Sequence, residues 1–218
     1  MHALIALWFG WVRDWGYLGI VILMAMESSI FPVPSEVVIP PAAFYAAEGR
    51  MSFWGVVIAG TIGSYLGSAI TYFISLWLGR KFIVRFGKYF LISEKKLELA
   101  EKWIHRYEAG GIFFARLLPV VRHLISIPAG IVKMNFLTFS AMTVVGAFLW
   151  CWVLAWLGVR AHAAEPNLIN DPEAMIHFIK GQSLWIILGI AVLAALYFLV
   201  LKLTAKPAPA APAAADAE

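Results

Sequence analysis

Four charged side chains, two acids followed by two bases, occur within apolar stretches of this chain and are the residues best suited to do chemistry. They are Glu27, Glu36, Arg116 and Arg122. An unpaired charge at the centre of a bilayer costs about 3 kcal/mol on insertion scales, so such residues persist where they face one another or a cavity. A guanidinium fork matches a phosphate group well. The arginines therefore predict binding of an anionic head group, and the glutamates could carry a coupled proton.

The same residues also fit a purely structural role, in which acid–arginine pairs hold two segments together. Buried ion pairs are weak evidence of stabilisation, because apolar packing would serve as well, and this favours the functional interpretation. His123, next to Arg122, could relay a proton, although a lone histidine is commonly just a hydrogen-bonded neighbour. The sequence contains no glycine-rich phosphate loop, zinc-binding His-Glu-x-x-His pair or nucleophile elbow. We therefore predict no cofactor, no metal and no enzyme activity.

Prolines interrupt both segments that carry these charges, residues 17–47 and 110–132. The prolines expected to break the helices and form the hairpins are Pro32, Pro34, Pro119 and Pro128. Proline removes a backbone donor and clashes with the preceding turn, so neither segment reads as a simple spanning helix. Broken backbone at membrane depth is tolerated only inside protein or beside a wet cavity. We therefore expect two re-entrant helical hairpins, each returning to the side from which it started.

The amino-acid composition indicates that the remaining segments lie in a lipid bilayer. Hydrophobic residues make up 62% of the 218 residues and charged residues only 14%, against roughly a quarter charged in soluble domains. Stretches 52–79, 134–158 and 183–201 are apolar and close to or above the roughly 20 residues that cross a bilayer. The predicted fold is an all-α membrane protein with about three to four transmembrane helices, preceded by a helical or interfacial segment at 1–16. The lone Cys151 excludes an internal disulfide.

Charge distribution predicts the orientation. Eight of the seventeen Lys and Arg residues lie between positions 80 and 106, whereas positions 160–180 hold two. The positive-inside rule therefore places an amphipathic segment at 80–108 in the cytoplasm and the loop 161–182 outside. Acidic residues alternate with the bases of the cytoplasmic segment, which argues against nucleic acid as a partner. The low-complexity tail 202–218 is expected to be disordered and cytoplasmic.

An internal repeat relates the two central spans. Arg50-Met-Ser-Phe53 resembles Lys133-Met-Asn-Phe136, and a glycine follows ten residues later in each copy, at Gly63 and Gly146. The charge distribution makes the two spans cross in opposite directions. The pattern indicates an inverted repeat with a site between its halves, as in secondary transporters, with chance similarity as the alternative.

Two motifs resemble signatures of a known family. Glu27-Ser-Ser-Ile-Phe-Pro-Val-Pro-Ser-Glu36 is similar to the first signature of DedA membrane proteins, also called VTT-domain or SNARE-associated proteins. Phe114-Ala-Arg-Leu-Leu-Pro-Val-Val-Arg122, followed by Pro128-Ala-Gly130, resembles the second, and Gly146 and Trp150 match the following span. Ser35 replaces a glycine found in many members.

The resemblance covers roughly residues 17–160 and carries expectations about fold and function. It implies re-entrant hairpins that meet within the membrane, cytoplasmic termini in bacteria, and lipid translocation. Bacterial members are similar to transporters that return undecaprenyl phosphate to the inner leaflet, while others handle phosphatidylethanolamine or scramble phospholipids. The family's essential acids and arginines correspond to the residues at 27, 36, 116 and 122.

The sequence therefore predicts a multi-pass transporter of the bacterial inner membrane with a cytoplasmic C-terminus. Expected partners are an anionic phospholipid or polyprenyl phosphate, and protons. The side of the N-terminus and the oligomeric state, including a homo-oligomer, stay open. A proton or ion antiporter and a non-transporting scaffold for envelope maintenance are the alternatives, and a membrane enzyme is the least expected.

Overall fold

Every regular element that the structure describes is a helix. A computed structural model describes residues 2–29, 33–86, 94–117, 124–165 and 174–182, together with 122, 188, 189 and 192. The elements are α1 (His2–Trp15), α2 (Tyr17–Glu27), the 3-10 helix η1 (Ser35–Val37), α3 (Ile39–Ala47), α4 (Phe53–Phe86), α5 (Glu94–Leu117), α7 (Ser126–Ile131) and α8 (Phe136–Ala164). The predicted all-α class is confirmed for these residues.

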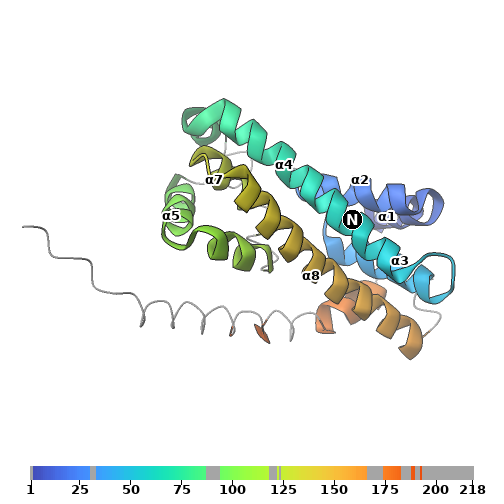
Figure 1. Ribbon diagram of the computed structural model, residues 1–218. Helices are drawn as coiled ribbons and strands as arrows, with labels where there is room; N and C mark the ends of the chain where they lie inside the picture. The colour runs from blue at the N-terminus through green and yellow to red at the C-terminus, as the bar shows by residue number, and fades with distance from the viewer. Residues whose placement is uncertain are drawn as a thin grey trace, which may run out of the picture.

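Two long helices form the axis of the molecule. α4 and α8 run side by side (Figure 1), and each contains an apolar stretch long enough to cross a membrane, Phe53–Arg80 and Phe136–Ala164. The α4 helix is broken at Gly79, whose φ of 70° suits glycine. The first turn of α8 is capped by Asn135, whose side-chain oxygen accepts from two backbone N–H groups. The third predicted span, 183–201, lies outside the described residues except at 188, 189 and 192.

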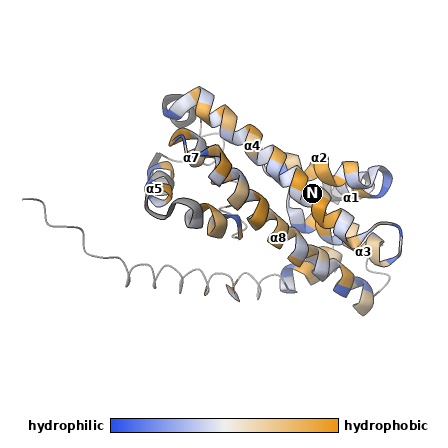
Figure 2. Cartoon of the chain, viewed as in Figure 1, coloured by the Kyte–Doolittle hydropathy of each residue, from blue (hydrophilic) through white to orange (hydrophobic). Residues whose placement is uncertain are grey.

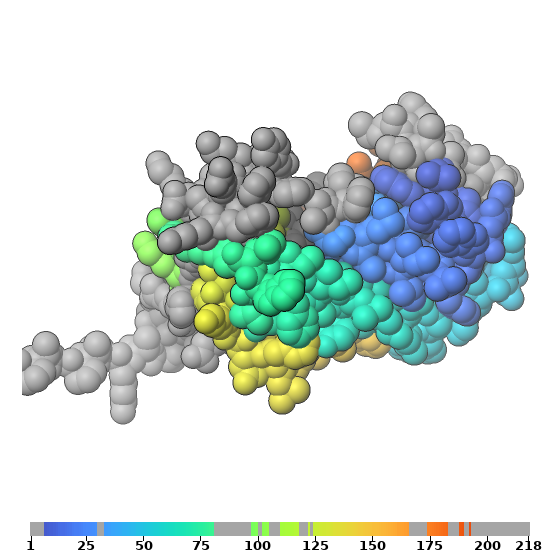
Figure 3. Space-filling view, turned by 90° about the horizontal axis from the view of Figure 1, so that it is seen from above, coloured from blue at the N-terminus to red at the C-terminus, as the bar shows by residue number. Residues whose placement is uncertain are grey.

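The surface of α4 is the reverse of that of a soluble helix. Large apolar side chains at intervals of four, from Trp54 through Ile58, Ile62 and Leu66 to Ile70, are exposed. The opposite face carries small and hydroxyl residues that are buried against protein. Hydrophobic residues run along both long helices (Figure 2), and the outer face of α4 lies open beside the N-terminal helices (Figure 3). This arrangement is typical of a helix with lipid on one side and close helix packing on the other.

In each half of the molecule, one shorter helix packs against α4 and another packs against α8. α2 packs along α4, while α3 packs mainly against α8. In the second half, α5 packs along α8 and α7 packs against α4. Figure 1 accordingly places α1, α2 and α3 around one end of the long helices and α5 and α7 around the other. Both broken segments therefore bridge α4 and α8.

Several segment boundaries differ from those drawn on the sequence. α5 continues through Gly110 and Gly111 without interruption, so it joins part of the amphipathic segment 80–108 to the start of segment 110–132. Glycine in a helix interior costs only about 1 kcal/mol, which neighbouring turns can offset. Residues 87–93, 166–173 and the tail 202–218 lie outside the described residues.

Glycine at position 63 permits the close approach of α2 to α4. A Cβ atom there would collide with the backbone carbonyl of Val21 and would lie 2.8 Å from the Cβ of Met24. Backbone atoms cannot yield cheaply, so we expect Gly63→Ala to lower the free energy of unfolding by about 1–3 kcal/mol. Thermal unfolding of the purified protein in detergent measures the effect.

Gly10 in α1 provides the matched control, because a Cβ atom there would meet nothing within 4 Å. Gly10→Ala is expected to be neutral or slightly stabilising, since alanine favours a helix interior over glycine by about 0.5–1 kcal/mol. Equal unfolding temperatures for the two variants would contradict the packing of α2 on α4.

Candidate functional site

A buried ion pair joins the two proline-broken segments. Arg122 Nη2 donates to Glu27 Oε1, and the side chains of the pair are 8% and 1% exposed. Glu27 is the last residue of α2, where the helix ends and the chain turns toward η1. The same carboxylate oxygen accepts the backbone N–H of Ser35 at 2.9 Å. The end of α2, the start of η1 and Arg122, four residues before α7, therefore meet at one point.

Ser35 and Trp150 complete the surroundings of the pair. The Ser35 hydroxyl accepts from Arg122 Nη2 at 2.5 Å and from Trp150 Nε1 at 3.2 Å. The guanidinium carbon of Arg122 lies 5.1 Å from the centre of the Trp150 ring. Such cation–π contacts strengthen when both groups are desolvated. Trp150, from the middle of α8, thus fixes the position of Arg122 relative to a long helix.

Arg116 lies nearby and is bound by hydroxyl and carbonyl groups. Its Nη1 donates to Ser68 Oγ at 2.8 Å and to the Arg122 carbonyl at 3.1 Å, and its Nη2 donates to Ser126 Oγ at 2.8 Å. The guanidinium also lies 5.6 Å from the ring centre of Phe139. No acidic side chain among the described residues comes within ion-pair distance of Arg116, although its residue surface is only 3% exposed.

The three charged side chains that the structure describes in this buried cluster, Glu27, Arg116 and Arg122, therefore carry one more positive than negative charge. Glu27 neutralises Arg122, and neutral hydroxyl and carbonyl groups solvate Arg116. Within the described part of the chain, the Nε atoms of both arginines and Thr143 Oγ1 are buried without a hydrogen-bond partner. An unsatisfied buried polar group costs about 1–3 kcal/mol, and more when it is charged. Such a site is suited to an anionic acceptor.

A row of hydroxyl groups on α4, which we call the hydroxyl stripe, passes the cluster. It comprises Thr61, Ser64, Ser68, Thr71 and Ser75, all buried. Ser64 bonds the Ser28 hydroxyl at 2.9 Å, and Ser68 receives the bond from Arg116. The hydroxyls of Thr61, Ser68 and Thr71 donate to carbonyls one turn earlier in α4. These donors need no outside partner, yet rotation about one bond would redirect them to a ligand.

The structure thus joins three of the predicted charged residues through hydrogen bonds, whereas the fourth, Glu36, neighbours the cluster without a described ion pair. Glu36, in η1, is half-buried, and no described basic side chain forms an ion pair with it. Pro34 caps η1, and Pro128 lies in the first turn of α7, where proline is tolerated. Pro32, Pro119 and His123 lie outside the described residues. Among the described residues, no group of three or more His, Cys, Asp or Glu side chains lies close enough together to hold a metal ion.

Sequence reasoning did not single out the hydroxyl stripe, Ser126 or Thr143. Their signal was spacing: the five hydroxyl residues of α4 recur every three or four positions, which places them on one helix face. Ser35 and Trp150 stood out only as matches to motifs. Ser35 accepts hydrogen bonds from Arg122 and Trp150, and the Trp150 ring also lies against the Arg122 guanidinium, which gives both a role at the site.

Comparison with known proteins gives a consistent family assignment. A family model described as the VTT domain matches residues 33–160. Undecaprenyl phosphate transporter A of Bacillus subtilis is 36% identical over 206 residues, which cover 94% of this chain and 98% of that protein. The Staphylococcus aureus protein of the same name is 33% identical over 151 residues, covering 67% of this chain and 74% of that protein.

A third relative carries a different kind of name. An alkaline phosphatase-like protein of Lactococcus lactis subsp. cremoris is 36% identical over 152 residues, covering 67% of this chain and 71% of that protein. No solved structure matches the chain.

Proposed function

Because the chain belongs to the VTT-domain family, the DedA family of membrane proteins, we propose that it transports undecaprenyl phosphate or a closely related anionic lipid. The match to the family confirms the resemblance carried by the two motifs. Two relatives named as transporters of this lipid, one of which aligns over nearly the whole chain, support the substrate.

The observation that carries the proposal is the surplus positive charge at Arg116. A phosphate monoester brings a charge of about −1.5 to −2 and three strong acceptor oxygens. The guanidinium of Arg116 already lies among hydroxyl groups of α4 and α7, which can donate to the same phosphate. The polyprenyl tail would stay in the bilayer against the exposed apolar surface of the long helices.

Charge balance gives Glu27 a role in this mechanism. In this mechanism Glu27 forms an ion pair with Arg122 when no lipid is bound. The lipid phosphate then replaces Glu27 as the partner of Arg122. Two arginines and a phosphate dianion sum to zero only if Glu27 is then protonated. Uptake of a proton with the lipid would follow, and its release would return Glu27 to Arg122. Glu36 and His123 are further candidates for the proton path.

The topology proposed for this cycle follows the charge distribution. The broken segments act as re-entrant hairpins of an inverted repeat, one open to each side of the inner membrane, and the C-terminus is cytoplasmic. Their alternate movement would carry the head group from the outer to the inner leaflet. The reciprocal packing of the two broken segments on α4 and α8 supports this arrangement.

Reconstitution into liposomes tests the proposal. With undecaprenyl phosphate placed in one leaflet, the purified protein should equilibrate the lipid faster than protein-free liposomes of the same composition. Equal rates would exclude transport of this lipid. An imposed pH gradient should change the rate if a proton moves with the lipid.

The same vesicles separate the other candidates. An antiporter would dissipate a proton or ion gradient without any polyprenyl phosphate, and a scaffold would do neither. The name of the Lactococcus relative makes a phosphatase worth measuring as well, through release of inorganic phosphate from the lipid.

A further inference from the structure

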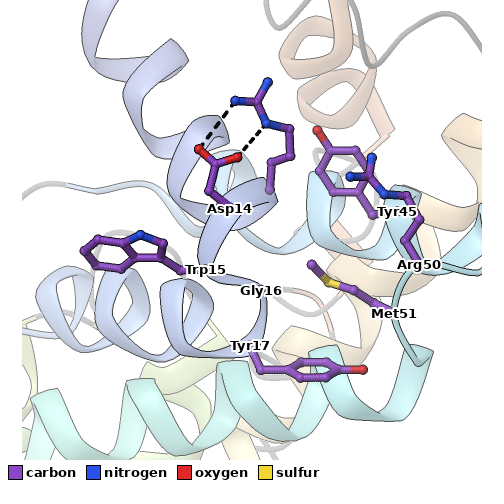
Figure 4. A pocket seen from close by; sticks show the side chains of 8 residues that line it. Asp14, Trp15, Gly16, Tyr17, Tyr45, Arg50 and Met51 are labelled. Carbon is purple, nitrogen blue, oxygen red and sulfur yellow. Dashed lines mark hydrogen bonds and ion pairs between the residues drawn. The ribbon is translucent and has the colours of Figure 1, made fainter.

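A second charged site lies well away from the buried cluster. It is a cavity of about 380 Å³ where the α1–α2 junction meets the loop between α3 and α4 (Figure 4). Its lining residues are Arg13, Asp14, Trp15, Gly16, Tyr17, Tyr45, Arg50 and Met51. We call it the outer cavity, because the Phe53 end of α4 is opposite the basic segment that the charge distribution places in the cytoplasm.

The two arginines of the outer cavity are held only weakly. Arg13 bonds its neighbour Asp14 at 2.8 Å, but both side chains are more than half exposed. Arg50 lies 3.8 Å from Glu48, beyond hydrogen-bond distance, and stacks at 4.6 Å over the Tyr45 ring. Exposed ion pairs contribute at most about 1 kcal/mol. Each guanidinium, with five N–H donors, can therefore turn to a stronger bidentate acceptor.

Aromatic side chains give the outer cavity the character of a membrane interface. Trp15, Tyr17 and Tyr45 are of the residue types that concentrate at head-group level. The Tyr17 hydroxyl accepts the Ser52 backbone N–H at 2.7 Å, which ties the α1–α2 junction to the start of α4. Leu18, next to Tyr17, is 61% exposed and gives a lipid tail an apolar surface.

The position of the outer cavity relates it to the buried cluster. α2 begins at Tyr17, in the cavity wall, and ends at Glu27, the partner of Arg122. At 1.5 Å per residue the two ends are about 15 Å apart along the helix axis. A head group that leaves the outer cavity along α2 would reach the buried arginines within half the thickness of a bilayer core.

We propose that the outer cavity is the first binding site for the phosphate monoester of the transported lipid, with Arg13 and Arg50 as its ligands. The inference rests on the proposed function and adds a site that the lipid occupies before the buried cluster. Asp14 competes with the phosphate for Arg13. The hydrogen bond from Arg13 holds the pKa of Asp14 below its usual value, so this carboxylate is charged at neutral pH.

The test measures the initial transport rate against the density of undecaprenyl phosphate in the outer leaflet. Arg50→Ala and Arg13→Ala should each raise the half-saturating density about tenfold, the equivalent of one charge-assisted hydrogen bond, and leave the maximal rate unchanged. Asp14→Asn should lower that density severalfold, because it frees Arg13. A merely structural ion pair would not improve binding when it is broken.

Arg160 supplies the matched control. It is an exposed arginine that stacks at 5.1 Å on Trp156 near the end of α8, outside the outer cavity. Arg160→Ala removes the same charge and should leave the half-saturating density unchanged. If Arg50→Ala and Arg160→Ala behave alike while wild type transports, the outer cavity is not a phosphate site. If wild type fails to transport, the proposed function falls instead.

Inorganic phosphate in the outer solution distinguishes the source of the ligand. Competition that Arg50→Ala abolishes would show that the outer cavity accepts the free anion as well as the lipid. No competition, with the effect of Arg50→Ala intact, would show that binding needs the lipid tail. Both outcomes support a phosphate site, whereas competition of equal strength in wild type and Arg50→Ala would contradict it.

Discussion

Replacing Arg116 by methionine is expected to lower the rate of lipid transport at least about a hundredfold while leaving the protein folded. Loss of a charge-assisted contact to a bound phosphate costs about 1.5–3 kcal/mol, and this residue also supplies the charge that the anion must balance. Methionine is of similar length and keeps the Cβ and Cγ atoms that pack near Gly146.

The stability of this variant distinguishes a functional arginine from a structural one. Arg116 is buried with no carboxylate within ion-pair distance among the described residues, so no ion pair of its own offsets its desolvation. An apolar residue of the same size should then leave the unfolding temperature unchanged or raise it. A large fall in that temperature would mean that Arg116 holds the fold together. Arg116→Lys retains the charge but cannot hold the geometry of the fork, so we expect about a tenfold loss.

Exchanging the charges of Glu27 and Arg122 is expected to restore stability but not transport. Either single variant, Glu27→Arg or Arg122→Glu, buries two like charges together and should destabilise the protein by about 3–5 kcal/mol or more. The double variant restores an ion pair, and unfolding measurements on all four proteins give the coupling energy.

The transport rate of the exchanged variant tests whether it matters which of the two positions carries the acid and which carries the arginine. Glu27 accepts the Ser35 N–H, and Arg122 donates to the Ser35 hydroxyl and stacks on Trp150. None of these contacts survives the exchange. The arginine would then stand at position 27, on α2, and no longer at position 122, on the same broken segment as Arg116. Recovery of the wild-type rate would contradict the phosphate-binding role of Arg122 and would show that the pair serves only to hold the two broken segments together.

The general architecture was readable from the sequence because it depends on local properties. Long charge-free stretches predicted the helices that became α4 and α8, and the prolines located the breaks near Glu27 and Arg122. That acids and arginines would meet followed from the cost of isolated charges in lipid. These arguments need no knowledge of which helices touch.

The details that escaped prediction all depend on long-range packing. Glu36 seemed equivalent to Glu27 in sequence, but its position in η1 leaves it outside the ion pair. The hydroxyl stripe hardly alters the hydropathy of α4, so only its contact with Arg116 reveals it. Arg13 and Arg50 both line the outer cavity. They are far apart in sequence, so the sequence alone does not indicate that they lie at the same site.

The reciprocal packing of the shorter helices has a mechanical consequence. α2 and α7 rest on α4, whereas α3 and α5 rest on α8. A tilt of one long helix against the other must therefore displace parts of both broken segments in the same movement. In the proposed cycle the two broken segments would therefore move together. If the tilt closes one side as it opens the other, the lipid crosses without a leak in the ion gradients on which the cell depends.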